Sequence, residues 1–286
     1  MFVRADRIRI GQIEDDFALH AIDFSWEGFE PVMTCAQVDT DETCRFDLED
    51  VSFAVSKKRV CVGQFGDEGH MPCPRNAPVG RLGQCPDCAG ESFVPQECIF
   101  NPPEKCENES CKMPDFCRRP HILYLAFYDT KVKIGMSSTR RVERRLIEQG
   151  ADAYALIGEF QSRYLAREME KRISEEMRLA QYFRQESLML NLARRVDAAG
   201  IEARHEGLRT SLSEAYQLSP GRLTWIDGYP IDLPLKTVPR LEPTWGMHRG
   251  EYIGCKGRLL IYEADGLVGL DLGDVPSRYL SRDGVL

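Results

Sequence analysis

Residues 121–173 read HILYLAFYDTKVKIGMSSTRRVERRLIEQGADAYALIGEFQSRYLAREMEKRI and decide the fold of the middle of the chain. Two apolar runs of β character, 121–127 and 131–136, flank the turn residues Tyr128-Asp129-Thr130. Two short runs of this kind, separated by a few turn residues, are typical of a β-hairpin. We therefore expect two paired strands at the start of this stretch.

After the hairpin the apolar period changes from that of a strand to that of a helix. Val142 and Leu146 are four residues apart and predict one buried helix face, which Gln149-Gly150 ends because glycine tolerates the left-handed geometry of a helix terminus. A third strand is expected over 153–160. A longer helix then carries apolar side chains at four-residue intervals: Leu165, Met169, Ile173 and Met177. The predicted order is strand, strand, helix, strand, helix.

The composition is that of a globular protein. The 286 residues are 43% hydrophobic and 29% charged, enough for a sizeable core and for about two domains. There is no apolar run near the ~20 residues that a membrane-spanning helix needs. The first residues lack the pattern of a secretion signal, so we expect a cytoplasmic protein with reduced thiols and no membrane partner.

The charge is unevenly distributed along the chain. The net charge is −8, but residues 118–184 hold 14 Lys and Arg against 9 Asp and Glu, a net of +5. Residues 1–117 carry −11 and residues 185–286 carry −2. The middle third could therefore bind phosphate. A solvated helix face with ion pairs such as Arg144 with Glu148 explains the same excess equally well.

Residues 61–117 differ in character from the rest. Eight of the eleven cysteines fall here, proline and glycine are dense, and apolar periodicity is nearly absent. Such a segment buries too little hydrocarbon to hold itself together. Disulfides are disfavoured in a reduced compartment, and a redox-active pair would need a βαβ setting. Structural zinc is the interpretation that we favour.

The zinc ligands are ranked by their spacing. Cys85-Pro-Asp-Cys88 has the two-residue gap that lets two thiolates share a tetrahedral ion. Further ligands are expected, in decreasing order, at Cys106, Cys111, Cys117 and Cys98. Cys73 is a weaker candidate, and Cys61 lies in an expected strand. His70 and His121 could also be ligands, although a lone histidine is more often hydrogen-bonded; Cys35 and Cys44 are interpreted as small buried hydrophobes.

Short strands are expected at both ends of the chain. Residues 51–55 and 59–63 predict a hairpin, and residues 252–254, 258–262 and 267–272 predict strands with turns at 265–266 and 273–274. A few such strands make a poor isolated domain, so we expect the terminal strands to pack together. Between the central stretch and these strands, two helices are expected over 185–199 and 201–216, broken at Gly200.

The central stretch resembles the GIY-YIG nuclease module. Leu123-Tyr124-Leu125 stands at the family's first motif, and Lys133-Ile134-Gly135 stands at the second, with lysine in place of tyrosine as in some phage-type subgroups. Arg145 matches the helix arginine, and Glu170 matches the glutamate of the late helix.

This resemblance implies an activity and a set of roles. Glu170 would hold one Mg²⁺ or Mn²⁺, Arg145 would contact the phosphate, and Tyr124 would position or deprotonate water. Lys133 would stand in the place of the second tyrosine, with Arg163 bracing Glu170. Arg141, Arg144, Arg145 and Arg163 would contact nucleic acid. Tyr124 also fits a core residue, and Arg145 and Glu170 also fit a structural ion pair.

From Cys61 to Leu190 the chain also resembles a family of uncharacterised prokaryotic proteins. Their cysteine-rich segment precedes P-H-x-x-Y-L-A and R-x-x-x-Q-G-A, which here are Pro120 to Ala126 and Arg145 to Ala151. We expect an α+β protein with a β segment (1–60), a zinc-binding β/loop segment (61–119), a GIY-YIG-like small antiparallel sheet with flanking helices (120–217) and a C-terminal β segment (218–286). The expected function is nucleic-acid cleavage or, alternatively, noncatalytic nucleic-acid binding or protein interaction.

Overall fold

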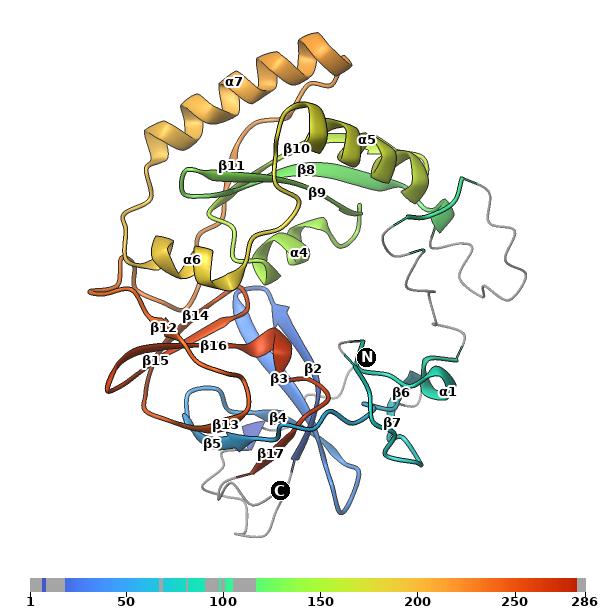
Figure 1. Cartoon of the computed structure of the whole chain (residues 1–286), viewed down its shortest axis with the longest axis vertical. Coiled ribbons are helices and arrows are strands. Elements are labelled where there is room, and N and C mark those ends of the chain that lie inside the picture. The colour runs from blue at the N-terminus through green and yellow to red at the C-terminus, as the bar shows by residue number, and fades with distance from the viewer. Residues whose placement is uncertain are drawn as a thin grey trace. The chain divides into compact units, whose positions relative to one another are not determined.

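The computed structural model describes residues 7–8, 19–66, 69–80, 82–90, 98, 101–104 and 117–281. The chain forms two compact units (Figure 1). Unit 1 contains Met1–Gly90, Tyr229–Asp232 and Thr237–Leu286, and unit 2 contains Glu91–Gly228 and Leu233–Lys236. The predicted α+β class is confirmed. Among the residues described, there is no helix long and apolar enough to cross a membrane.

Unit 1 is built on a seven-stranded sheet that draws on both ends of the chain. Its strand order is β1-β4-β3-β2-β17-β5-β13. The bounds are β1 Arg7–Ile8, β2 Leu19–Glu27, β3 Glu30–Gln37, β4 Thr43–Phe46, β5 Ser52–Val55, β13 Gly246–Arg249 and β17 Tyr279–Ser281. Because β17 pairs with both β2 and β5, the last strand of the chain lies between two N-terminal strands.

Two smaller sheets complete unit 1. One has the order β12-β16-β15-β14, with β12 Arg240–Leu241, β14 Glu251–Lys256, β15 Leu259–Ala264 and β16 Gly266–Asp271. The three strands expected over 252–272 form as β14, β15 and β16, whereas β12, β13 and β17 were not predicted; η3 (Leu272–Asp274) forms the last predicted turn as a 3₁₀ helix. The other sheet pairs β6 (Gln64–Gly66) with β7 (Gly69–Met71), and α1 (Pro86–Ala89) follows them.

The predicted hairpin over 51–63 is wrong. Ser52–Val55 forms β5, but its two neighbours are β13 and β17. Residues 59–62 instead make hydrogen bonds to separate segments, with Val60 N–H donating to Ser277 O and Cys61 N–H donating to Ala77 O. Strands distant in the sequence thus occupy both edges of β5, and local periodicity carries no signal of them.

Unit 2 contains a four-stranded sheet of order β11-β10-β8-β9. The strands are β8 His121–Tyr128, β9 Lys131–Ser138, β10 Ala153–Phe160 and β11 Thr224–Trp225. The helices are α4 Val142–Glu148, α5 Arg163–Glu176, α6 Gln185–Leu192 and α7 Ala198–Tyr216. The predicted order strand, strand, helix, strand, helix over residues 121–176 is confirmed, and α4 ends immediately before Gln149-Gly150 as expected.

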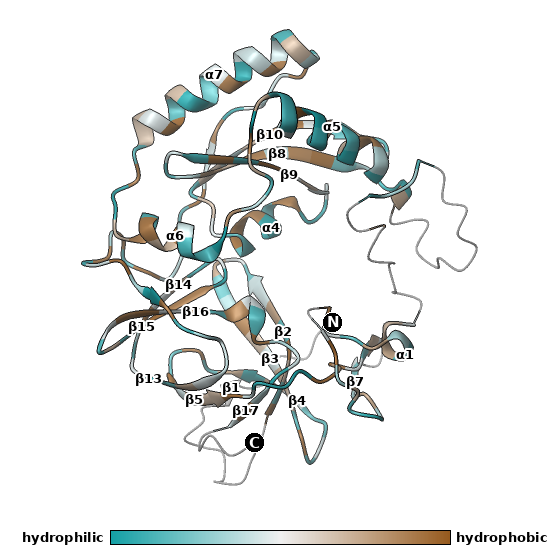
Figure 2. Ribbon diagram, viewed as in Figure 1, coloured by the Kyte–Doolittle hydropathy of each residue, from teal (hydrophilic) through white to brown (hydrophobic). Residues whose placement is uncertain are grey.

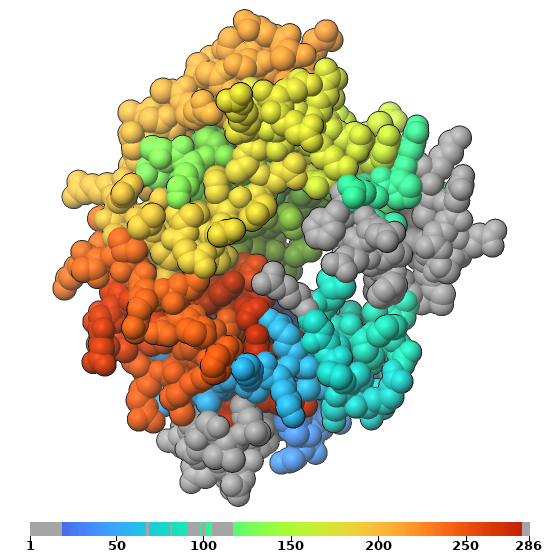
Figure 3. Space-filling view, viewed as in Figure 1, coloured from blue at the N-terminus to red at the C-terminus, as the bar shows by residue number. Residues whose placement is uncertain are grey.

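Both faces of this sheet are covered by helices. Leu123, Leu125 and Phe127 of β8 pack into a cluster with apolar residues of α5 and α7, whereas Tyr124 and Ala126 pack with Val142 and Leu146 of α4. All eight residues of β8 are therefore buried, which explains its continuous apolar sequence. Figure 2 shows β8 as strongly hydrophobic and much of α5 as hydrophilic, and in Figure 3 α5 (yellow) and α7 (orange) form part of the surface of this unit.

The helix break predicted at Gly200 is also wrong. α6 ends at Leu192, and α7 begins before Gly200. The Asp197 carboxylate caps α7 by accepting a hydrogen bond from Gly200 N–H at 3.0 Å. A Cβ at position 200 would overlap the Asp197 carboxylate, so the glycine belongs to the first turn of the helix and makes room for its cap.

Candidate metal centre and cationic cluster

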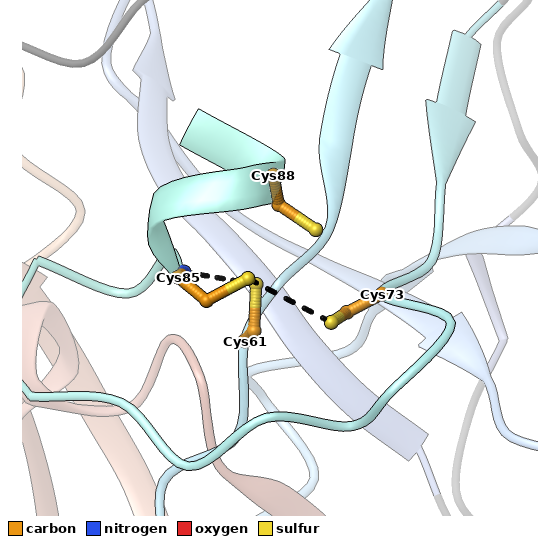
Figure 4. A group of neighbouring side chains, drawn as sticks. All are labelled: Cys61, Cys73, Cys85 and Cys88. Carbon is orange, nitrogen blue, oxygen red and sulfur yellow. Dashed lines mark hydrogen bonds between the residues drawn. The ribbon is translucent and has the colours of Figure 1, made fainter. Parts of the chain in front are cut away.

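Four buried cysteines of unit 1 converge on one point; we call them the four-cysteine cluster (Figure 4). They are Cys61, Cys73, Cys85 and Cys88. Their Sγ atoms all lie within 4.8 Å of one another, and those of Cys73 and Cys85 are 4.0 Å apart. A tetrahedral zinc with Zn–S bonds of about 2.3 Å places its sulfurs roughly 3.8 Å apart. The four sulfurs could therefore hold a zinc ion with small movements.

Backbone amides favour the thiolate form of Cys61, Cys73 and Cys85. Burial nevertheless raises the pKa of Cys61 and of Cys88, whereas the pKa of Cys73 and Cys85 is lowered. The N–H groups of Cys85 and Gly63 donate to Cys61 Sγ at 3.2 and 3.4 Å. The backbone N–H of Cys88 lowers the pKa of Cys85 to about 7. Because metals bind thiolates and hydrogen bonds orient them, this environment fits a metal-bound cluster. The cluster draws on a hairpin and a one-turn helix of only four residues, the kind of small structure that a metal stabilises.

The structure brings together only part of the ligand set expected from the sequence. Cys85 and Cys88 belong to the cluster, whereas Cys98 and Cys117, both half-buried, are not among its four members. Cys106 and Cys111 lie outside the described residues. The expectation that these four are ligands therefore stays a prediction.

Cys61 and Cys73 complete the cluster, although their positions in the sequence make both weaker candidates than Cys85 and Cys88. Cys61 was placed in a strand that does not form. Gly63, two residues after Cys61, was the feature of the sequence that could have indicated a ligand. In a Cys-x-Gly turn, the N–H of the glycine reaches the sulfur of the cysteine. The two histidines considered as ligands contact backbone carbonyls instead, His70 at Val62 O and His121 at Arg119 O.

In unit 2, the Tyr124 hydroxyl contacts Arg145 of α4 and Gln149, the residue that caps the C-terminus of α4. Arg145 Nε donates to Tyr124 Oη at 3.3 Å, and Tyr124 Oη donates to Gln149 Oε1 at 3.3 Å. The Tyr124 ring covers Gly135, where a Cβ would lie 2.6 Å from the phenol, so only glycine fits there. Tyr124 is 1% exposed, and its hydroxyl is held between one donor and one acceptor.

Lys133 and Glu170 lie close enough to Arg145 for their charges to interact. Lys133 on β9 is 7% exposed and Glu170 on α5 is 4% exposed. Burial, helped by the nearby Arg145 charge and opposed by Glu170, lowers the pKa of Lys133 to about 8. The Lys133 Nζ also lies 5.7 Å from the centre of the Tyr128 ring.

Arg167 holds the carboxylate of Glu170. Its Nη1 donates to Glu170 Oε2 at 2.6 Å and to Gln181 Oε1 at 3.0 Å. We call Lys133, Arg145 and Arg167, together with Glu170, the cationic cluster. A divalent cation prefers several carboxylate and water oxygens. Glu170 is one carboxylate, already paired with a guanidinium and near two more cations, so this donor set does not fit Mg²⁺ or Mn²⁺.

The other arginines expected to contact nucleic acid have different environments. The side chains of Arg141 and Arg144 are 59% and 51% exposed, and both pair with Glu148, at 3.1 and 3.0 Å. Arg163 is 6% exposed and donates to Cys98 O at 2.5 Å. Arg163 thus connects α5 to the cysteine-rich segment, whereas Arg141, the N-cap residue of α4, and Arg144 lie at the surface.

Comparison with known proteins adds a family. The family model described as 'Protein of unknown function (DUF2797)' matches residues 49–271 of the chain. The matched range includes both the four-cysteine cluster and the cationic cluster. No curated protein and no solved structure matches the chain.

Proposed function

The chain belongs to DUF2797, a family of unknown function, and we propose from its own residues that it is a zinc-stabilised protein that binds nucleic acid through phosphate groups. Zinc would be held by the four-cysteine cluster, and phosphate would be bound by unit 2. With four thiolates the zinc has no open position, so its role is to stabilise the fold.

The observation that carries the proposal is the surplus of positive charge around Arg145. Within the described part of the chain, Lys133, Arg145 and Arg167 all interact with the carboxylate of Glu170, and Arg145 interacts also with that of Glu148. Arg144 of α4 and Arg141, the N-cap residue of that helix, share the carboxylate of Glu148. Buried and half-buried cations in excess of their counter-ions favour an anionic ligand, and guanidinium groups match phosphate in shape and charge.

The resemblance to the GIY-YIG module supports a nucleic acid as the source of the phosphate. The order β8, β9, α4, β10, α5 agrees with that of the module, and Tyr124 and Arg145 are in direct contact. The net charge of +5 over residues 118–184 would steer a polyanion to this part of the chain.

Cleavage of a phosphodiester is the second candidate. The observation in its favour is the lowered pKa of Lys133, since a lysine that is partly neutral near pH 8 can accept a proton. Incubation with nucleic acids of different structure, with Mg²⁺, with Mn²⁺ and with EDTA, separates turnover from binding alone.

The test of the binding proposal is the salt dependence of affinity for labelled RNA and DNA. Each phosphate contact adds about 0.7 to 0.9 to the magnitude of the log–log slope. Arg141→Ala combined with Arg144→Ala should weaken binding on all sequences and lower that magnitude by up to about 1.8. The control is Arg209→Ala, an exposed arginine of α7 that pairs with Glu206 in the same way. Affinity that ignores salt, or that falls equally in Arg209→Ala, contradicts the proposal.

A further inference from the structure

The carboxylate of Glu170 is paired with Arg167, whose guanidinium is also bound by a second segment. Arg167 precedes it by three residues on α5, and the side chains of this ion pair are 16% and 6% exposed. Gln181 fixes the same guanidinium from beyond the end of the helix. The neighbouring Ala180 accepts a hydrogen bond from Ile134 N–H, which ties this segment to β9 beside Lys133.

We propose that Arg167 takes the place of a divalent cation beside Glu170, so that the cationic cluster binds a phosphate group without a metal. The choice of phosphate rests on the proposed function. The replacement of a cation by Arg167 does not rest on the proposed function, because it follows from the contacts of Glu170 alone.

Charge complementarity explains why the cluster can work without a metal. In a metal-dependent phosphate site, the divalent cation bridges a protein carboxylate and the anion and neutralises both. Here the guanidinium of Arg167 neutralises Glu170, while Lys133 and Arg145 lie beside it as positive charges; Arg145 has a second acidic neighbour, Glu148, which it shares with Arg141 and Arg144. A phosphate group would neutralise that remaining charge, whereas a divalent cation would add to it.

The arrangement of Arg167 suits a fixed cation. Its guanidinium has one acceptor on α5 and another on the following segment, so its orientation is set before any ligand binds. A preorganised guanidinium loses little conformational freedom on binding phosphate. Glu170 then acts as the residue that positions Arg167, and not as a metal ligand.

The experiment measures Mn²⁺ binding by electron paramagnetic resonance on the zinc-loaded protein. If the wild type binds any Mn²⁺, the Glu170→Gln substitution should leave that binding unchanged. Arg167→Gln frees the carboxylate and should produce weak Mn²⁺ binding that is not detected in the wild type, a gain of roughly 10- to 100-fold for removal of a charge-assisted hydrogen bond, even though Lys133 and Arg145 remain. Arg167→Lys keeps the positive charge and should behave as the wild type, and adding Glu170→Gln to Arg167→Gln should abolish the gain.

Two results would overturn the inference. One is Mn²⁺ binding by the wild type that is lost in Glu170→Gln, a comparison that stands even if the Arg167 variants do not fold. The other is a folded Arg167→Gln with no gain in Mn²⁺ affinity. Failure of the proposed function is seen separately, as the absence of salt-sensitive nucleic-acid binding in the wild type with and without Mg²⁺.

Discussion

At the scale of single residues, Lys133 carries a charged group into the interior of unit 2, on strand β9. Its place in Lys-Ile-Gly suggested a site residue, but a strand lysine can equally face solvent. The structure buries it beside Arg145 and Glu170, and burial lowers its pKa to about 8. Periodicity cannot predict this, because the residues that bury Lys133 come from other elements. Gly135, by contrast, belongs to the Lys-Ile-Gly motif that the sequence shows. Its contact with the Tyr124 ring explains why glycine is needed at this position.

The lowered pKa predicts how Lys133 affects stability. The folded state gives up this proton near pH 8 and the unfolded state near pH 10.5, so this residue makes the protein more stable as pH rises through that window. Lys133→Met removes the cost of the buried charge. It should raise the free energy of unfolding at pH 7 by up to about 3 kcal/mol, and the gain should vanish above the upper limit of the window.

Urea denaturation of wild type and Lys133→Met at a series of pH values is the measurement. Other groups titrate in both proteins, so the difference between the two curves isolates Lys133. A difference that stays constant with pH would show that Lys133 is not the residue whose charge is suppressed.

At the scale of elements, the periodicity of apolar residues predicted those helices and strands that are stabilised by contacts between residues close in the sequence. The hairpin β8–β9 and the helices α4 and α5 follow from periodicity, because each packs against neighbours close in the sequence. β5 was predicted, but its partners were not, since β13 lies about 190 residues away and β17 farther still. The start of α7 was missed for another reason: Gly200 reads as a breaker unless the cap at Asp197 is seen.

The cap at Asp197 predicts a stability change. Asp197→Ala removes the acceptor for Gly200 N–H and should lower the free energy of unfolding by about 1 kcal/mol. Asp197→Asn keeps a side-chain oxygen and should lose much less. Thermal or urea unfolding of the three proteins checks this, and an Asp197→Ala protein as stable as the wild type would mean that the cap contributes nothing.

At the scale of the whole molecule, the four-cysteine cluster stands apart from the hydrophobic core, because its four buried side chains are all potential metal ligands. Length, composition and the cysteine-rich segment were enough to predict a metal centre in an α+β protein. Its membership was not predictable from spacing alone, because Cys61 and Cys73 come to Cys85 through the folding of the β6–β7 hairpin. Removing the proposed zinc should therefore unfold this part of unit 1, because metal binding and folding are coupled in small segments that a metal holds together.

The most direct test of the account is the zinc content of cysteine variants prepared without chelator. Cys61→Ser and Cys73→Ser should each lose one zinc per chain relative to the wild type. The control is Cys35→Ser, because Cys35 is a buried cysteine of β3 outside the cluster, and its loss should leave the zinc content unchanged. Zinc retained in full by both Cys61→Ser and Cys73→Ser would contradict the proposed centre.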